Sequence, residues 1–222
     1  MKIPVLVLCA LATAVTLPAE TTEAILARMN DVSANFKAMS SNISMTTFTK
    51  VIDDKEVETG TLQMQRLPGK PARALLKVSG ETDSHEVFLA NNMVRIYTPK
   101  SKLVKDYNVS KSSNLVDQFL LLGFGSSGKE LMESYEITNA GTEKIAGQDT
   151  THLVLTPKLA EVKEKIAKVE MWIPVGKAYP VQQQFFEPNG NYRTTTYTDL
   201  TINPPIKGSL EFKLPPGTKK EQ

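Results

Sequence analysis

The chain has 222 residues, of which 41% are hydrophobic and 23% are charged, a composition typical of one or at most two globular domains. Its formal net charge of +2 argues against the strongly basic surface of a nucleic-acid-binding protein, so no nucleic-acid partner is expected. The sequence has one cysteine and two histidines, which argues against a zinc site, because such a site needs three or four protein ligands.

The N-terminus has the three-part pattern of a secretory signal peptide. Lys2 precedes an apolar run from Ile3 to Val15, and Ala19 provides a small residue at a cleavage point. The run is shorter than the about 20 apolar residues that a membrane-spanning helix needs. Cys9 lies within the apolar run rather than after it, so a lipid anchor is not expected. We therefore predict an exported periplasmic protein with a mature chain of residues 20–222. A retained N-terminal anchor is the alternative.

A helix is predicted from Thr21 or Thr22 to about Met39. Either threonine can cap the first turn, and apolar residues then recur at intervals of three and four: Ile25, Met29, Val32, Phe36 and Met39. Because the opposite positions are polar, this helix should lie on an apolar surface.

Short strands separated by turn signals follow, at residues 42–52, 57–66, 72–78, 84–90, 93–97 and 103–109. The second and third form a hairpin around Pro68 and Gly69. Strand side chains alternate between faces, so Leu62 and Met64 share one apolar face with Arg66 at its end. An arginine there is unusual, because a buried guanidinium cannot lose its charge and must find acceptors nearby.

The middle of the chain interrupts this series. A second helix, apolar nearly all round, is predicted at 115–124, followed by a Gly/Ser segment and a further helical turn at 129–134. Strands then resume at 135–140, 142–145, 150–156, 169–174, 179–186, 191–203 and 210–214, with a charged helix at 158–168. The pattern predicts a mainly β protein with some α: one domain, a long curved antiparallel sheet with helices on one face.

No segment indicates catalysis. Residues 123–129 (GFGSSGK) match two nucleotide-binding patterns, but those patterns require a preceding strand and parallel βαβ units. We interpret the segment as a flexible joint after the second helix. His85 and His152 are far apart, and no nucleophile motif or acid/base pair stands out. Neither an enzyme activity, nor a catalytic residue, nor a metal, nor a cofactor is predicted.

Apolar side chains are more numerous than the sheet and helices need. The sheet would contribute Leu62, Met64, Leu76, Val78, Trp172 and Phe185, and the helices above it Phe36, Met39, Phe119, Leu120, Leu122 and Phe124. These residues form either an ordinary core or a cavity that accepts a guest molecule. The eight methionines favour a cavity slightly, because thioethers repack easily around different ligands.

Several motifs, taken in order along the chain, resemble those of the periplasmic outer-membrane lipoprotein carrier family, LolA. They are GTLQMQR at 60–66 with the following Pro-Gly, IYTP at 96–99, HLVLTP at 152–157, YTD at 197–199 and LEFKLPPG at 210–217. The resemblance implies an incomplete antiparallel β-barrel (half-barrel) covered by a helical lid. It also implies that the cavity carries acyl chains of lipoproteins, or lipids, from the inner to the outer membrane, and that Arg66 hydrogen-bonds the lid in the closed state.

The same resemblance implies partners: an inner-membrane lipoprotein-releasing ABC transporter that loads the carrier, and an outer-membrane acceptor. A monomer is expected. There are departures from the family pattern, since Leu67 separates Arg66 from Pro68 and alanines stand at 72 and 74 where an aromatic residue is common. The alternative function is a half-barrel sensor or interaction module that binds a protein partner without carrying lipid. Sensor relatives with an extra domain would be longer.

Overall fold

The computed structural model describes residues 20–81, 83–112, 120–205 and 208–221. The predicted signal peptide, Phe119 and the first half of the second predicted helix lie outside these ranges. Within them, no helix combines the length and the apolar character that a membrane span requires.

The first helix, α1 (Thr22–Ser33), begins at the predicted position. The Thr21 hydroxyl caps it by accepting a hydrogen bond from the Ala24 amide at 3.3 Å, which satisfies one of the N–H groups left free in a first helical turn. Ile25 and Met29 are buried, so the apolar stripe found in the sequence faces the interior.

The prediction that this helix continues to Met39 is wrong. It ends at Ser33, and from Ala38 onward the chain forms a strand. The Asn203 side chain fixes this change of direction, because its oxygen accepts hydrogen bonds from the Lys37 and Ala38 amides at 2.7 and 3.2 Å. Strand pairing and a distant asparagine thus override the helical spacing of the apolar residues.

The strands of the described chain belong to one sheet. They are β1 (Ala38–Thr49), β2 (Asp54–Gln65), β3 (Arg73–Ser79), β4 (Ser84–Ala90), β5 (Met93–Thr98), β6 (Leu103–Asn108), β7 (Tyr135–Ile145), β8 (Gln148–Pro157), β9 (Lys168–Pro174), β10 (Gln182–Phe186), β11 (Tyr192–Ile202) and β12 (Lys219–Lys220). In space their order is β12-β6-β5-β4-β3-β2-β1-β11-β10-β9-β8-β7. Neighbours are antiparallel except β12 and β6, which are parallel.

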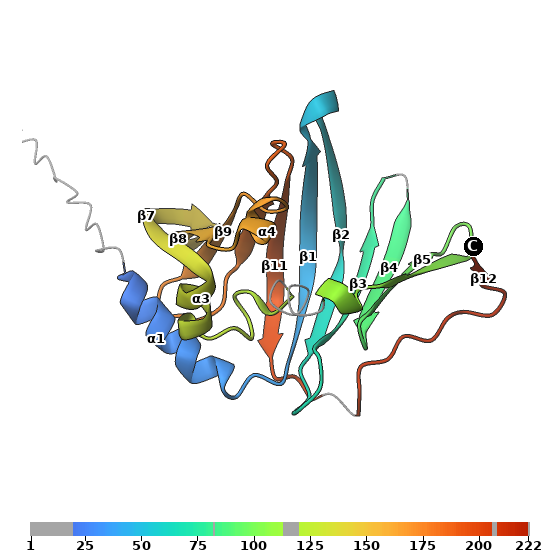
Figure 1. Ribbon diagram of the computed structural model, residues 1–222, viewed down its shortest axis with the longest axis horizontal. Helices are drawn as coiled ribbons and strands as arrows, with labels where there is room; N and C mark the ends of the chain where they lie inside the picture. The colour runs from blue at the N-terminus through green and yellow to red at the C-terminus, as the bar shows by residue number, and fades with distance from the viewer. Residues whose placement is uncertain (1–19, 82, 113–119, 206–207, 222) are drawn as a thin grey trace, which may run out of the picture.

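This order has two ends, so the 12-stranded sheet is open rather than closed into a full barrel. The helices α1 and α3 (Gly128–Ser134) lie side by side in front of β7, β8 and β9 (Figure 1). The predicted fold, a half-barrel with a helical lid, is confirmed. We call the sheet face that carries Ile43, Leu62 and Leu76 the inner face; it also carries Met171, which packs beneath α1.

Some element boundaries differ from the predictions. The two strands expected at 135–140 and 142–145 are one strand, β7, with a bulge between Asn139 and Gly141. The charged helix expected at 158–168 is reduced to α4 (Ala160–Lys163), because the Ala167 amide already bonds to the Phe186 carbonyl at 2.8 Å. The described residues also include two short 3₁₀ turns, Lys50–Ile52 and Ser110–Ser112.

The C-terminal segment was predicted to contain a strand at 210–214, and this is wrong. The segment crosses the outer face, where Phe212 packs against Phe88 and Tyr97 with ring centroids 6.1 and 6.2 Å away. The Gln65 side chain fixes its start by accepting a hydrogen bond from the Leu210 amide at 2.7 Å. Pairing with the sheet is resumed only at β12, beside β6 (Figure 1).

Candidate functional site

An apolar cavity of about 400 Å³ lies on the inner face of the sheet. Its lining includes Ile43 and Met45 of β1, Leu62 of β2, Leu76 of β3, Phe185 of β10 and Tyr197 of β11. Three of these residues, Leu62, Leu76 and Phe185, were assigned to the acyl-chain cavity from the sequence. Polar side chains line the end nearest the strand tips: Thr47, Glu187, Asn191 and Arg193.

Strand register brings the apolar residues together. Ile43 stands opposite Tyr197 of β11 on one side and opposite Gly60 of β2 on the other, while Leu62 stands opposite Leu76. Opposite residues in an antiparallel pair point to the same face, so all these side chains meet on the inner face. Gly60 adds no side chain there, and β2 and β3 approach so closely that a Cβ at this position would lie 1.8 Å from the Lys77 carbonyl oxygen.

The neighbouring part of the inner face is filled. Met64 and Val78 from the sheet pack there with Phe36 and Phe124 in one cluster, and each is at most 3% exposed. Leu120 contacts the same cluster and is partly buried. These five residues were all expected in the cavity, and in this closed arrangement they form packed core next to the open space.

The cover of this cluster is the lid segment, which we define as residues 120–126. Its backbone folds on itself, since the Leu121 carbonyl accepts hydrogen bonds from the amides of Phe124, Gly125 and Ser126 at 3.0, 2.9 and 3.1 Å. Phe124 packs in the cluster and forms a T-shaped pair with Tyr197, with 5.0 Å between the ring centroids. The lid therefore places an aromatic ring against the inner face of the sheet.

Arg66 holds one end of the lid segment. Nη1 donates to the Gly125 carbonyl at 2.8 Å, and Nη2 donates to the Ser33 carbonyl at the end of α1. The guanidinium also lies over the Phe36 ring, 5.5 Å from its centroid. Arg66 thus joins β2, the end of α1 and the lid. This is the geometry implied by the LolA resemblance, in which the arginine hydrogen-bonds the lid.

Gln183 holds the other end and was missed in the sequence. Its Nε2 donates to the Leu122 carbonyl at 3.0 Å, and its Oε1 accepts from the Tyr197 hydroxyl at 2.6 Å. Burial raises the pKa of Tyr197 above the usual range, so the hydroxyl keeps its proton and remains a donor. A glutamine at an inward position of a strand was the available signal, because a buried amide requires hydrogen-bond partners.

The glycines of the 123–129 motif serve packing. A Cβ at Gly125 would lie 3.0 Å from the Phe36 ring, and one at Gly128 would lie 2.3 Å from the Leu26 carbonyl oxygen of α1. Ser127 and Glu130 form a capping box that starts α3. We expected a flexible joint here, and the structure instead shows closely packed residues in which the lid ends and α3 begins. Helical residues 120 and 121 precede it, instead of the strand that a phosphate-binding loop requires.

Three further expectations need correction. Trp172 lies on the outer face, where it stacks on His152 at 4.5 Å and donates to Glu143 Oε2 at 2.8 Å. Met39 belongs to β1 and thus to the sheet, not to the cover. Leu122 packs into the core beneath α1 rather than over the cavity.

Comparison with known protein families supports the fold and revises the family. The model of the MucB/RseB N-terminal domain matches residues 23–160, more than half of the chain. The chain belongs to this family. The resemblance to LolA carriers therefore holds for the fold, and membership in the LolA carrier family itself is not shown. Comparison with curated protein sequences gives no match.

Solved structures with a similar fold share little sequence with this MucB/RseB-type domain. An uncharacterized conserved protein from Thermus thermophilus is 10% identical, with a TM-score of 0.50 over 90% of this chain and 98% of that protein. The Mycobacterium tuberculosis lipoprotein LppX is 14% identical, with a TM-score of 0.49 over 84% of this chain and 99% of LppX. The Pseudomonas aeruginosa MucA/MucB complex contains a chain that is 12% identical, with a TM-score of 0.45 over 84% of this chain and 58% of the matched chain.

Proposed function

We propose that this protein binds the acyl chain of a lipoprotein or lipid on the inner face of its sheet and carries it across the periplasm. The observation that carries the proposal is the apolar cavity of about 400 Å³ beside a lid held by Arg66. Its volume lies within the range of about 300–1,000 Å³ found for small-molecule sites. Opening the lid would withdraw Phe124 and enlarge the apolar surface available to a guest.

The energetics favour exchange controlled by the lid. Burial of one methylene group contributes about 0.8 kcal/mol, so a chain of about 15 carbons would gain roughly 12 kcal/mol if it were fully buried. A carrier that bound this tightly would release its cargo slowly. Displacing the lid opposes binding, because the Arg66 hydrogen bonds and the packing of Phe124 must be given up first. The lid can thus bring the affinity into a range that permits transfer.

The direct test is binding of a fluorescent fatty acid to the delipidated protein. Leu62→Trp places a large side chain in the cavity and should weaken binding at least tenfold. Thr61→Trp is the matched control, because Thr61 is the next residue of β2 and is exposed on the outer face. Melting temperatures of both variants show whether each remains folded. Equal affinities for the wild type and the folded Leu62→Trp variant would refute acyl binding in this cavity.

A second candidate function is binding of a protein partner. It is favoured by the match to the MucB/RseB family, since MucB occurs in a complex with MucA among the matched structures. A membrane-anchored or secreted partner would then replace the lipid cargo. Tight binding of a partner protein by delipidated protein that takes up no fatty-acid probe would favour this function over the carrier.

The proposed pathway also requires export. Removal of residues 1–19 would release a mature chain that begins at Glu20, and the intact mass of the protein recovered from the periplasm tests this. A lipid adduct on Cys9 would contradict a diffusible carrier. The proposal also includes loading by an inner-membrane ABC transporter and delivery to an outer-membrane acceptor. Assays of transfer between inner- and outer-membrane fractions test these two steps.

A further inference from the structure

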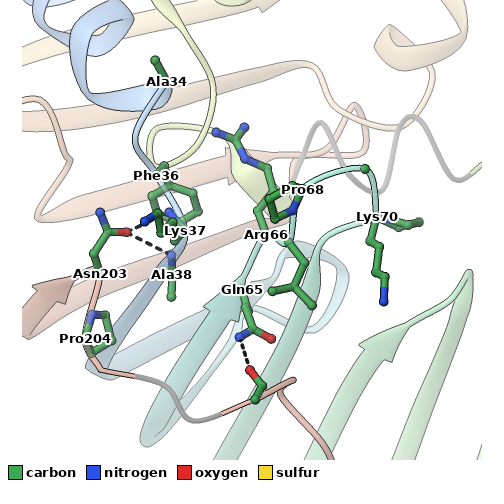
Figure 2. Close-up of a pocket in the computed structure, with 14 residues that line it drawn as sticks. Ala34, Phe36, Lys37, Ala38, Gln65, Arg66, Pro68, Lys70, Asn203 and Pro204 are labelled. Carbon is green, nitrogen blue, oxygen red and sulfur yellow. Dashed lines mark hydrogen bonds between the residues drawn. The ribbon is translucent and has the colours of Figure 1, made fainter.

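A groove of about 710 Å³ lies next to Arg66 (Figure 2), and its lining includes no residue of the lid segment. Three segments that are distant in sequence form its walls: residues 34–38 after α1, the 65–71 turn between β2 and β3, and the chain around Asn203. Hydrogen bonds hold two of these walls in place, from the Lys37 amide to Asn203 Oδ1 at 2.7 Å and from Gln65 Nε2 to the Gly208 carbonyl at 2.9 Å. The groove is therefore a built feature of the fold.

The charges around this groove are all of one sign. Its lining contains Lys37, Arg66 and Lys70 and no aspartate or glutamate. In the part of the chain that the structure describes, none of these three cations forms an ion pair with a carboxylate. Arg66 instead donates to two neutral carbonyls. Three uncompensated cations around one concave site create a positive potential that attracts anions.

We propose that this groove binds a phosphate-bearing ligand, and that an occupied groove draws Arg66 away from the lid. The inference rests on the proposed lid-closing role of Arg66 and adds to it the signal that opens the lid. A guanidinium matches phosphate with two parallel hydrogen bonds, whereas lysine ammonium groups act as flexible point charges. Arg66, Lys37 and Lys70 together supply both kinds of contact.

The coupling follows from competition for one side chain. Arg66 lines the groove (Figure 2), and its guanidinium donates hydrogen bonds to the lid and to the end of α1. Hydrogen bonds between two charged groups are stronger than those from a charged donor to a neutral carbonyl, so a bound phosphate competes with Gly125 and Ser33 for the guanidinium. Loss of the Gly125 bond leaves Gln183 as the remaining side-chain anchor of the lid among the described residues. An anion bound outside the cavity thereby favours opening of the cavity.

Two sources can supply the phosphate group: a soluble phosphate ester, or the headgroup of a membrane lipid. They share the chemistry that the groove recognises and differ in where the lid would open, in solution or at a membrane surface. Pyrophosphate represents the first source. Vesicles of phosphatidylglycerol represent the second, with vesicles of phosphatidylcholine as the control of zero net charge.

The experiment combines calorimetry with hydrogen exchange on the full-length protein without acyl ligand. The Gly125 and Ser126 amides, which bond to the Leu121 carbonyl within the lid, report opening. Saturating pyrophosphate or phosphatidylglycerol should accelerate their exchange at least about fivefold, at the low end of allosteric couplings. The double variant Lys37→Gln/Lys70→Gln should weaken anion binding at least about tenfold and abolish the acceleration. The double variant Lys129→Gln/Lys213→Gln removes the same charge from exposed positions outside the groove lining and should behave as wild type.

A response to pyrophosphate identifies a soluble ligand, and a response to phosphatidylglycerol alone identifies a membrane headgroup. Absence of binding, equal binding by the two double variants, or binding without faster exchange of the lid amides would overturn the proposal. Because the exchange measurement needs no acyl ligand, it is independent of whether the protein carries lipid. If the protein binds no fatty acid but still responds to the anion, the carrier function is refuted and the proposed phosphate site in the groove is not.

Discussion

The two halves of the inner face differ in how completely they bury their apolar side chains. Beneath α1 and α3, Leu153, Val169 and Met171 are 0% exposed and form a continuous core with Ile25 of α1. On the other half, Leu62 and Leu76 are only partly buried and line a cavity of about 400 Å³. One sheet thus carries a filled core on β8 and β9, near one edge, and unfilled apolar surface on its central strands.

The covers of the two halves differ in the same way. A stripe of apolar residues along α1 packs against the core of the sheet. The helix α3 approaches α1 so closely at Gly128 that no side chain fits there. The lid segment is shorter, and it is held by hydrogen bonds from Arg66 and Gln183, by the ring of Phe124 and by Leu122, which packs into the core beneath α1. Burial of large apolar area is costly to reverse, whereas a few hydrogen bonds can be exchanged. We therefore expect the α1 half to contribute most of the stability, and the lid half to be the part that opens in the proposed function.

The largest effect is expected in the filled half. Leu153→Ala removes a side chain that is 0% exposed and leaves a cavity, which should lower the free energy of unfolding by about 3–5 kcal/mol. Leu76→Ala is the matched control on the other half and should cost about 1 kcal/mol, because Leu76 is already beside open space. Urea denaturation measures both values. Equal losses would remove the distinction between the two halves.

Arg66→Leu should alter ligand exchange more than stability. The substitution removes two hydrogen bonds from a charged donor, and each contributes at least about 1.5 kcal/mol. The equilibrium between the closed and open lid should therefore shift by about 3 kcal/mol toward the open state, which is roughly a hundredfold. We expect a folded variant that binds an acyl probe more tightly and releases it poorly to acceptor membranes. Arg73→Leu is the control, because Arg73 also donates to a backbone carbonyl, that of Leu210, away from the lid. A large drop in melting temperature with an unchanged off-rate would show that Arg66 only stabilises the core.

The second lid anchor should produce a smaller change. Tyr197→Phe removes the hydroxyl that donates to Gln183 Oε1 and loosens the amide that holds the Leu122 carbonyl. A neutral hydrogen bond contributes about 0.5–1.5 kcal/mol, so exchange of the lid amides should become about two- to tenfold faster. Tyr192→Phe on the same strand keeps its ring stacked on Phe48 and should leave that exchange unchanged. Identical exchange in the wild type and both variants would exclude Gln183 as an anchor of the lid.

The smallest effect concerns the far edge of the sheet and depends on pH. Hydrogen bonds from Arg95 lower the pKa of Asp106 from 3.8 to about 2. Because the folded pKa is lower than the unfolded one, the pair stabilises the protein above about pH 4, and this contribution is lost as the pH falls toward 2. Asp106→Asn should therefore cost about 1 kcal/mol at pH 7, since Arg95 is one third exposed, and only a small part of that at pH 2, where the folded carboxyl is about half protonated.

Denaturation at pH 7, 4 and 2 measures this difference. Asp149→Asn is the control, because its ion pair with Lys144 is exposed and should contribute little at any pH. A constant gap between the wild type and Asp106→Asn down to pH 2 would show that the carboxylate acts through packing rather than charge. Neither substitution should change acyl binding, since both lie outside the cavity lining.

The sequence by itself determined most of the sheet and the position of Arg66. Alternating apolar residues and turn dipeptides located β2 to β6 to within a few residues, because the period of two and the turn chemistry are local properties of the chain. The alternation also placed Leu62 and Met64 on one face, with Arg66 at the end of their row. The charge of Arg66 predicted that acceptors lie nearby, and the resemblance to LolA carriers implied that the lid supplies them.

Only the tertiary structure decided which residues meet across the sheet. Trp172 was assigned to the cavity with Phe185. Its register opposite Gln182 turns it to the outer face, whereas Phe185, opposite Val169, points inward. A shift of one residue reverses the face of a side chain, and the register depends on pairing between strands that are distant in sequence. For the same reason the end of α1 at Ser33, fixed in part by Asn203, and the Gln183 anchor could not be predicted from local patterns.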